Sequence, residues 1–364
     1  MPPVVRFCRA SESALWPFND HSPARVSLDK PAASGHKERR LRTIKSWLRS
    51  AVQNPPPPRR PRAGAIWLTA LVCLALARMP APAQTNAPDT DAFSFAITCD
   101  MRGFVGPARA GKRYFDGACE ALHVVGAGAF MIVPGDCDPI PPVRATLDRY
   151  LGSNYIWYPV AGNHESETRA DMAWLRRWAS NGIPHLVRSG PAGAETTMYS
   201  FDYGNSHFVA LNNYFNGKTD AGWRSSFATN SLDWLAADLA ANRKPLVWVI
   251  SHEPLESQRD MDTGRLRHKG GLLASQKERG ARLLQLLKQY PIRAYLCGHT
   301  HDTSAVKVQG LWQVDAGHAR GAGDSGAPST FLKIRVAGTR AWLDIFRADK
   351  RGTNYELKHT VELD

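Results

Sequence analysis

Five short polar motifs in this chain carry side chains that commonly bind metal ions, and each follows an apolar run. The motifs are Asp100, Gly135-Asp136, Gly162-Asn163-His164-Glu165, Ser251-His252-Glu253-Pro254 and Gly298-His299-Thr300-His301. Carboxylate, imidazole and amide donors of this kind suit Fe, Zn or Mn. Two such ions about 3.5–4 Å apart can ionise a water molecule near neutral pH while they neutralise a phosphoryl group. The motifs predict a metal-dependent phosphoric ester hydrolase in which a metal-bound hydroxide attacks phosphorus directly.

Alternating strand and helix patterns position the first three motifs. We predict strands at 93–100, 129–136 and 155–161, and helices at 112–125, 142–151 and 166–180. This β-α-β-α-β order indicates a parallel sheet, in which ligands bind beyond the carboxyl ends of the strands. Taken singly, each aspartate or asparagine could be a turn residue and each histidine a core residue. Their order at strand ends favours one shared site.

The second half of the chain changes character. The pattern predicts a hairpin at 197–211, a helix at 230–242, a strand at 245–251, a surface loop over the site at 256–271, a helix at 276–289 and a strand at 292–297. Further short strands are predicted at 306–308, 311–314, 331–336 and 341–346. Because strands resume after the helices, we expect a second sheet packed on the first.

Together the motifs resemble those of the calcineurin-like metallophosphoesterase superfamily over about residues 93–346. The stretch 199–212 (YSFDYGNSHFVALN) and Leu232-Asp233-Trp234-Leu235 are similar to its purple acid phosphatase and cyclic-nucleotide phosphodiesterase branches. The resemblance implies an α/β fold, a four-layer αββα sandwich of two mixed β-sheets flanked by helices. That fold agrees with the two sheets expected from the strand pattern.

The resemblance also implies a role for each motif residue. Asp136 would bridge two metal ions, and His164 would lie outside the coordination sphere, where it donates a hydrogen bond or proton to the leaving oxygen. The other ligands divide by site, with Asn163, His252 and His299 at the second metal and Asp100 and His301 at the first.

Arg102 departs from the family pattern. The first family motif is Asp-x-His, but Asp100-Met101-Arg102 places arginine at the position of a histidine ligand. A guanidinium group has no lone pair for a cation, so the first metal site should be weaker than the second. Arg102 could turn outward onto a structural carboxylate. The sharper hypothesis is a catalytic role, in which its fork binds two phosphoryl oxygens.

Pro139 is the second departure. Purple acid phosphatases have a tyrosine ligand at this position, and related phosphatases have an aspartate that orients the catalytic histidine. Proline supplies neither, so no tyrosinate-to-iron colour is expected. Asp138 could orient His164, although a solvated turn carboxylate is the simpler role.

Three other groups are weaker candidates for contact with substrate. His318 and Arg320 lie in a Gly-rich loop and could line the substrate pocket, or His318 could be a surface residue. His268, with Arg265 and Arg267, lies in the irregular loop and could meet an anionic substrate, although a solvated basic loop is the default.

Charge is concentrated near the N-terminus of this 364-residue chain. The chain has 46 Lys/Arg and 33 Asp/Glu residues. Residues 1–83 contain 14 of the basic and 4 of the acidic residues, so residues 84–364 contain 32 basic and 29 acidic residues. A net charge of +3 in the latter part gives no support for a polyanion-binding surface. We therefore expect a small phosphorylated substrate and no specific nucleic-acid binding.

An export signal is predicted at 59–83. Arg59, Arg60 and Arg62 form a basic region, 63–77 is uncharged and apolar, and Ala81-Pro82-Ala83 resembles a cleavage site. The apolar run is shorter than the roughly 20 residues that span a bilayer, so we expect a cleaved signal and a periplasmic or secreted protein with no stable membrane span. The alternative is an uncleaved anchor.

The remaining segments follow from this signal. Residues 1–58 are too long for a signal's basic region, which indicates a start codon assigned too far upstream or a disordered tail. Residues 84–92 are a linker, and 93–364 form the phosphoesterase domain. The cysteines outside the leader, Cys99, Cys119, Cys137 and Cys297, are expected to be free buried thiols.

Phosphomonoester hydrolysis is the activity that we expect. One alternative is a phosphodiesterase acting on cyclic nucleotides, nucleic acid or lipid headgroups. Another is a metal-poor, non-catalytic relative that kept the fold after losing a first-site ligand.

Overall fold

A computed structural model describes residues 91–102, 115–222, 224–320 and 326–364. The predicted disordered or mis-assigned segment 1–58, the signal 59–83 and all but the last two residues of the linker lie outside the described residues. In the part that is described, no helix has the length and apolarity needed to cross a membrane. The four cysteines in it are buried and unpaired, as predicted.

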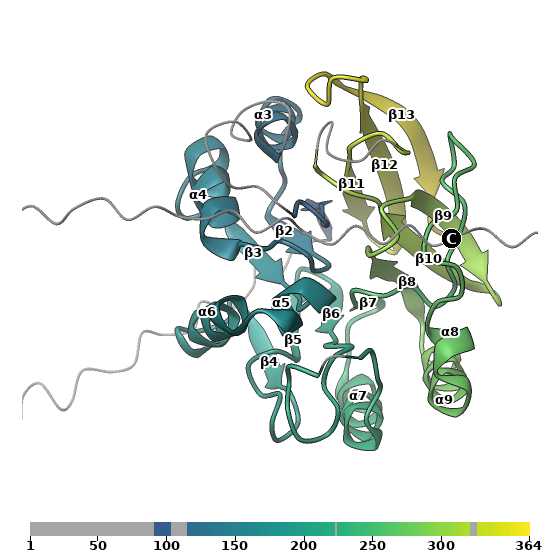
Figure 1. The fold of residues 1–364 in the computed structure, drawn as a ribbon. Coiled ribbons are helices and arrows are strands. Elements are labelled where there is room, and N and C mark those ends of the chain that lie inside the picture. The colour runs from purple at the N-terminus through teal and green to yellow at the C-terminus, as the bar shows by residue number, and fades with distance from the viewer. Residues whose placement is uncertain (1–90, 103–114, 223, 321–325) are drawn as a thin grey trace, which may run out of the picture. The chain divides into compact units, whose positions relative to one another are not determined.

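The first sheet has six strands in the order β13-β12-β11-β1-β2-β3 (Figure 1). Their bounds are β1 Ala92–Ile97, β2 Phe130–Val133, β3 Ile156–Pro159, β11 Thr330–Ala337, β12 Arg340–Ala348 and β13 Tyr355–Glu362. Strands β1, β2 and β3 are parallel, as the β-α-β-α-β pattern predicts. Their carboxyl ends therefore lie at one edge of the sheet.

The second sheet has seven strands in the order β4-β5-β6-β7-β8-β10-β9. Their bounds are β4 Leu186–Ser189, β5 Tyr199–Tyr203, β6 Ser206–Ala210, β7 Leu246–Ile250, β8 Ile292–Cys297, β9 Thr303–Val308 and β10 Leu311–Ala316. β5 and β6 form the predicted antiparallel hairpin, and β6, β7 and β8 run parallel.

The second sheet expected from the later strands is present. The strands predicted at 331–336 and 341–346 nevertheless join the first sheet, because β11 pairs antiparallel with β1 over the whole length of β1. That pairing satisfies the backbone groups on the edge of β1 that β2 leaves unpaired. It also places Leu332 and Ile334 in the core between the sheets.

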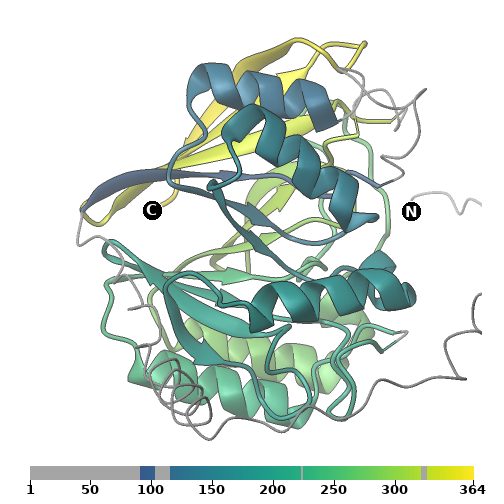
Figure 2. The ribbon, with the colours of Figure 1, turned by 90° about the vertical axis from the view of Figure 1, so that its left-hand side faces the viewer.

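Helices cover both outer faces (Figures 1 and 2). The first sheet packs against α3 (Phe115–Val125), α4 (Ile140–Leu151) and α6 (Arg169–Ser180). The second packs against α7 (Thr229–Ala241), α8 (Leu272–Ser275) and α9 (Lys277–Lys288). The domain is therefore the expected four-layer αββα sandwich. The helix predicted at 166–180 is two helices, α5 (Asn163–Glu167) and α6, separated at Thr168 by extended backbone.

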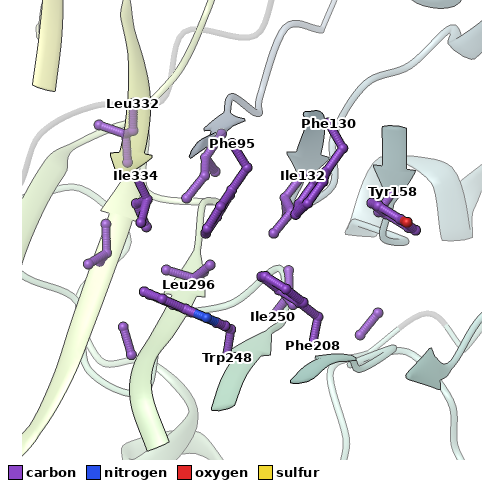
Figure 3. Packing of buried hydrophobic residues seen from close by; sticks show 14 of the residues in the cluster. Phe95, Phe130, Ile132, Tyr158, Phe208, Trp248, Ile250, Leu296, Leu332 and Ile334 are labelled. Carbon is purple, nitrogen blue, oxygen red and sulfur yellow. The ribbon is translucent and has the colours of Figure 1, made fainter. Parts of the chain in front are cut away.

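Aromatic side chains hold the two sheets together (Figure 3). Phe95 on β1 meets Phe208 and Trp248 edge-on, with ring centroids 5.3 and 5.5 Å apart. Phe130 on β2 also meets Phe208, at 5.4 Å. These contacts join β1 and β2 of the first sheet to β6 and β7 of the second. The core therefore sets the relative position of the strands that carry the polar motifs.

Candidate metal centre

Each predicted ligand follows closely after a strand of the two sheets. Asp100 follows β1, Asp136 follows β2, His252 follows β7, and His299 and His301 follow β8. Four of these residues have left-handed backbone, with φ of 54° at Asp100 and Asp136, 72° at His299 and 59° at His301. Such conformations cost a non-glycine residue about 1–3 kcal/mol each and concentrate at functional sites. Here they redirect the side chains that follow the strands.

Two motif glycines are required by close contacts. A Cβ on Gly162 would lie 2.2 Å from Asp136 Oδ1, and one on Gly298 would lie 2.5 Å from Asp100 Oδ2. Any side chain at either position would push a carboxylate aside. The glycines in these motifs therefore belong to the geometry of the site.

His252 lies at the centre of a cluster of electron-pair donors. Its Nδ1 lies 2.7 Å from the Pro134 carbonyl oxygen, which can only accept, so Nδ1 carries the proton and Nε2 has the lone pair. That Nε2 lies 3.1 Å from His299 Nδ1, 3.2 Å from Asn163 Oδ1 and 3.4 Å from Asp136 Oδ1. We call these four atoms the acceptor cluster.

The acceptor cluster fits a metal ion. Ligand atoms held about 2.1 Å from one ion at angles between octahedral and tetrahedral are about 3.0–3.4 Å apart, which matches all three distances. Burial and the neighbouring His252 lower the pKa of His299 to about 2, so its ring is neutral. Burial and the charge of Asp100 raise the pKa of Asp136, and a cation would offset both effects. Ligand atoms of Asp100, Asp136 and His252 lie within 4.8 Å of one another.

Two residues to which the sequence assigned no role hold this arrangement. The buried carboxylate of Glu165 accepts hydrogen bonds from the backbone N–H groups of Asp136 at 2.9 Å, Cys137 at 2.7 Å and Gly162 at 2.7 Å. Asn213 Oδ1 accepts from the backbone N–H of His252 at 2.9 Å. The position of Glu165 in the Gly-Asn-His-Glu motif could have indicated its supporting role, whereas no sequence motif indicated one for Asn213.

His164 lies beside the cluster. Its Nε2 is 3.6 Å from Asp136 Oδ2, and its Nδ1 is 3.1 Å from Glu167 Oε2, one turn later on α5. Glu167 thus provides an orienting carboxylate that Pro139 lacks. Asp138, the substitute considered from the sequence, instead accepts a hydrogen bond from Arg102 Nε at 3.2 Å.

The other half of the site is arranged differently. Asp100 Oδ1 lies 3.2 Å from His301 Nε2, and Asp100 Oδ2 accepts a hydrogen bond from the backbone N–H of His299 at 2.9 Å. The guanidinium of Arg267 donates to His301 Nδ1. Asp100 and His301 are both buried. Asp100 Oδ1, which faces His301 Nε2, accepts no hydrogen bond from the described residues, so these two atoms could also bind a cation.

The basic loop at 256–271 reaches the site. Arg265 donates from Nε to Asp302 Oδ1 at 2.5 Å and from Nη2 to the His301 carbonyl at 2.9 Å. The ring of His268 lies against that of His299, with centroids 4.6 Å apart. The simpler expectation of a solvated basic loop does not describe Arg265, which is partly buried, whereas His268 is exposed.

His318 is fully buried, not a surface residue, and its ring lies 5.7 Å from that of His301. Its Nε2 lies 3.1 Å from the Ala327 carbonyl oxygen, and its Nδ1 accepts from the backbone N–H of Arg320 at 3.3 Å. Because backbone groups engage both ring nitrogens, His318 supports His301 from behind. Contact of Arg320 with substrate stays a prediction.

Solved structures with similar folds are only distantly related in sequence. GAP50, the anchor in the inner membrane complex of Plasmodium, is 13% identical over 76% of this chain and 89% of its own, with a TM-score of 0.46. PhoD is 10% identical over 77% of this chain and 71% of its own, with a TM-score of 0.49. A putative 5'-nucleotidase from Staphylococcus aureus is 14% identical over 74% of this chain and 53% of its own, with a TM-score of 0.41. No curated protein matches this chain.

A family model gives a direct assignment. The model of the calcineurin-like phosphoesterases matches residues 111–303, more than half of the 364 residues. This segment contains Asp136, Asn163, His252 and both histidines of the Gly-His-Thr-His motif. The chain therefore belongs to the calcineurin-like phosphoesterase family.

Proposed function

We propose that this protein is a metal-dependent phosphoric ester hydrolase that acts on phosphomonoesters. The acceptor cluster carries the proposal, because His252 Nε2, His299 Nδ1, Asn163 Oδ1 and Asp136 Oδ1 face one another at the spacing of ligands on one ion. When bound, the metal would neutralise charge on the phosphoryl oxygens and make water acidic enough to ionise near neutral pH.

His164 would act on the leaving group. Its Nδ1 faces the carboxylate of Glu167, which fixes the orientation of the ring and partly offsets the lowering of the His164 pKa by burial and Arg102. The Nε2 edge lies on the side of Asp136, next to the cluster. A proton on Nε2 can then pass to the ester oxygen as its bond to phosphorus breaks.

Positive side chains beside the cluster favour a monoester. Arg102 donates to Asp138 and Arg267 donates to His301, so two guanidinium groups lie near the expected ligands. A phosphomonoester carries up to two negative charges near neutral pH, whereas a diester carries one. Fixed cations stabilise the first more strongly.

Metal content and substrate preference test the proposal together. We expect chain purified without chelator to contain Fe, Zn or Mn, and to hydrolyse nitrophenyl phosphate faster than bis-nitrophenyl phosphate. Chelation should abolish turnover, and adding back one of the three metals should restore it. Faster turnover of the bis-ester would indicate a phosphodiesterase. Absence of turnover with every metal would favour a non-catalytic relative.

We also propose that the protein is exported to the periplasm or secreted. The basic residues Arg59, Arg60 and Arg62, the apolar run and the Ala81-Pro82-Ala83 site support this proposal. N-terminal sequencing of the native protein should begin at Gln84. An intact Met1 would contradict cleavage.

A further inference from the structure

We propose that Arg347, on β12 of the first sheet, is a positioning residue for substrate binding. It fixes the 256–271 loop, in which Arg267 and His268 lie against two histidines of the candidate metal centre. This inference rests on the proposed function and deepens it, because it concerns the affinity of the site for a phosphomonoester dianion. A buried ion pair between Arg347 and Asp260 carries the argument.

Both members of this ion pair are removed from solvent. Arg347 Nη2 donates to Asp260 Oδ2 at 2.7 Å, and 1% and 0% of the two side chains are exposed. Charges in the interior give up their hydration, so such a pair adds little to stability compared with well-packed apolar side chains. Its contribution is a fixed geometry, since the guanidinium fork holds its partner in one orientation. We therefore interpret the pair as a device that places the loop.

Asp260 transmits this position to the loop and to both sheets. Its Oδ1 accepts from the backbone N–H groups of Asp262 at 3.1 Å and Thr263 at 2.9 Å. Its Oδ2, which Arg347 binds, also accepts from the backbone N–H of Thr303 at 3.0 Å. One carboxylate thus connects the loop to β12 in the first sheet and to the start of β9 in the second.

A second carboxylate of the loop meets the same guanidinium. Asp262 Oδ2 lies 2.9 Å from Arg347 Nη1, and Asp262 Oδ1 lies 2.7 Å from His359 Nε2. Arg347 therefore spans two loop carboxylates, Asp260 and Asp262, with different nitrogens of one rigid group. A lysine at this position would supply a single ammonium on a flexible stem. The arrangement depends on the arginine fork and not only on its charge.

The far end of the loop contacts the metal centre. Arg267 donates to His301 Nδ1, and the ring of His268 lies 4.6 Å from that of His299, centroid to centroid. His268 is exposed and has left-handed backbone with φ of 50°, a strained conformation of the kind found at functional sites. A displaced loop would move a cation and an imidazole away from the place where a phosphoryl group would bind.

The acceptor cluster is supported from elsewhere. Glu165 and Asn213 hold the backbone of Asp136 and His252 through hydrogen bonds that do not involve the 256–271 loop. A loosened loop should therefore leave the metal in place. A change that weakens binding of substrate and transition state equally raises KM and leaves kcat unchanged.

Arg347→Lys tests the inference, because it keeps a positive charge beside the buried Asp260 but removes the fork. It should raise KM for nitrophenyl phosphate about tenfold or more and change kcat by less than about twofold, at unchanged metal content. The dissociation constant of inorganic phosphate, measured at equilibrium with the metal-loaded chain, should rise by a similar factor. Hydrogen exchange at amides of the 256–271 loop should become faster.

Two further variants separate positioning from a general loss of structure. Asp262→Asn alters a partly exposed side chain and should produce a smaller change of the same kind, with little addition when it is combined with Arg347→Lys. Arg335→Lys breaks a two-pronged contact with Asp344 in the same sheet, away from the loop, and should alter neither KM nor loop exchange.

The outcomes distinguish this inference from the proposed function. Unchanged KM and loop exchange in folded Arg347→Lys chain would overturn it, and so would loss of metal or a fall in kcat as large as the rise in KM. If Arg347→Lys does not fold, judged by circular dichroism, Asp262→Asn decides by the same measurements. A wild-type chain that holds metal but neither binds phosphate nor hydrolyses monoesters would overturn the hydrolase proposal, whereas loop exchange would still decide whether Arg347 positions the loop.

Discussion

Replacing His252 with alanine is expected to remove the bound metal and to lower kcat/KM by about 1,000-fold or more. The Nε2 atom of His252 lies 3.1–3.4 Å from three other members of the acceptor cluster, so its loss leaves the cluster without its central ligand. Metal ions contribute several kcal/mol of transition-state stabilisation in hydrolases, and about 4 kcal/mol corresponds to this loss of rate. Metal content per chain and nitrophenyl phosphate hydrolysis measure the two effects.

Two companion variants control for loss of folding. His252 is fully buried, so alanine also creates a cavity. Asn163→Ala removes a partly exposed ligand and should lose metal with less effect on the free energy of unfolding. His123→Ala changes an exposed histidine on α3 and should retain both metal and activity. A folded His252→Ala protein with full metal content would refute the ligand assignment.

Replacing His164 with glutamine should leave metal content unchanged but lower kcat by about 100- to 10,000-fold for substrates with poor leaving groups. The side chain lies beside Asp136 but outside the acceptor cluster, so its loss should remove proton donation and leave metal binding intact. Nitrophenolate departs without protonation, so nitrophenyl phosphate should lose much less. The ratio of kcat values for alkyl and nitrophenyl phosphates measures the difference.

Replacing Glu167 should lower kcat less than replacing His164, because Glu167 only orients the histidine ring. Its pair with His164 is partly exposed, so Glu167→Gln should cost about 1 kcal/mol, or roughly fivefold in kcat on the alkyl ester. Combined with His164→Gln, it should add nothing further, because it acts through that ring. Glu278→Gln on the exposed face of α9 is the matched control. Equal losses on both esters would argue that His164 does not protonate the leaving group.

Local pattern was sufficient for much of the fold. The runs around Phe95, Phe130 and Trp157 read as buried parallel strands because apolar side chains fill them, and the structure places β1, β2 and β3 there. Strands β4 and β13 were missed because they alternate between half-buried and exposed residues and carry little apolar signal. The break at Thr168 was missed because helical periodicity continues across it.

By itself, the sequence determined the family and the residues of the candidate metal centre. Ligand types at strand ends are a local property, and the carboxyl ends of parallel strands meet at one edge of a sheet. Only the tertiary structure decided how those residues are used. The contact of Arg267 with His301 joins positions 34 residues apart, and that of Arg102 with Asp138 joins positions 36 apart. The packing of two sheets and a loop brings these partners together, so no local pattern could reveal that Arg267 contacts His301 or that Arg102 turns toward Asp138.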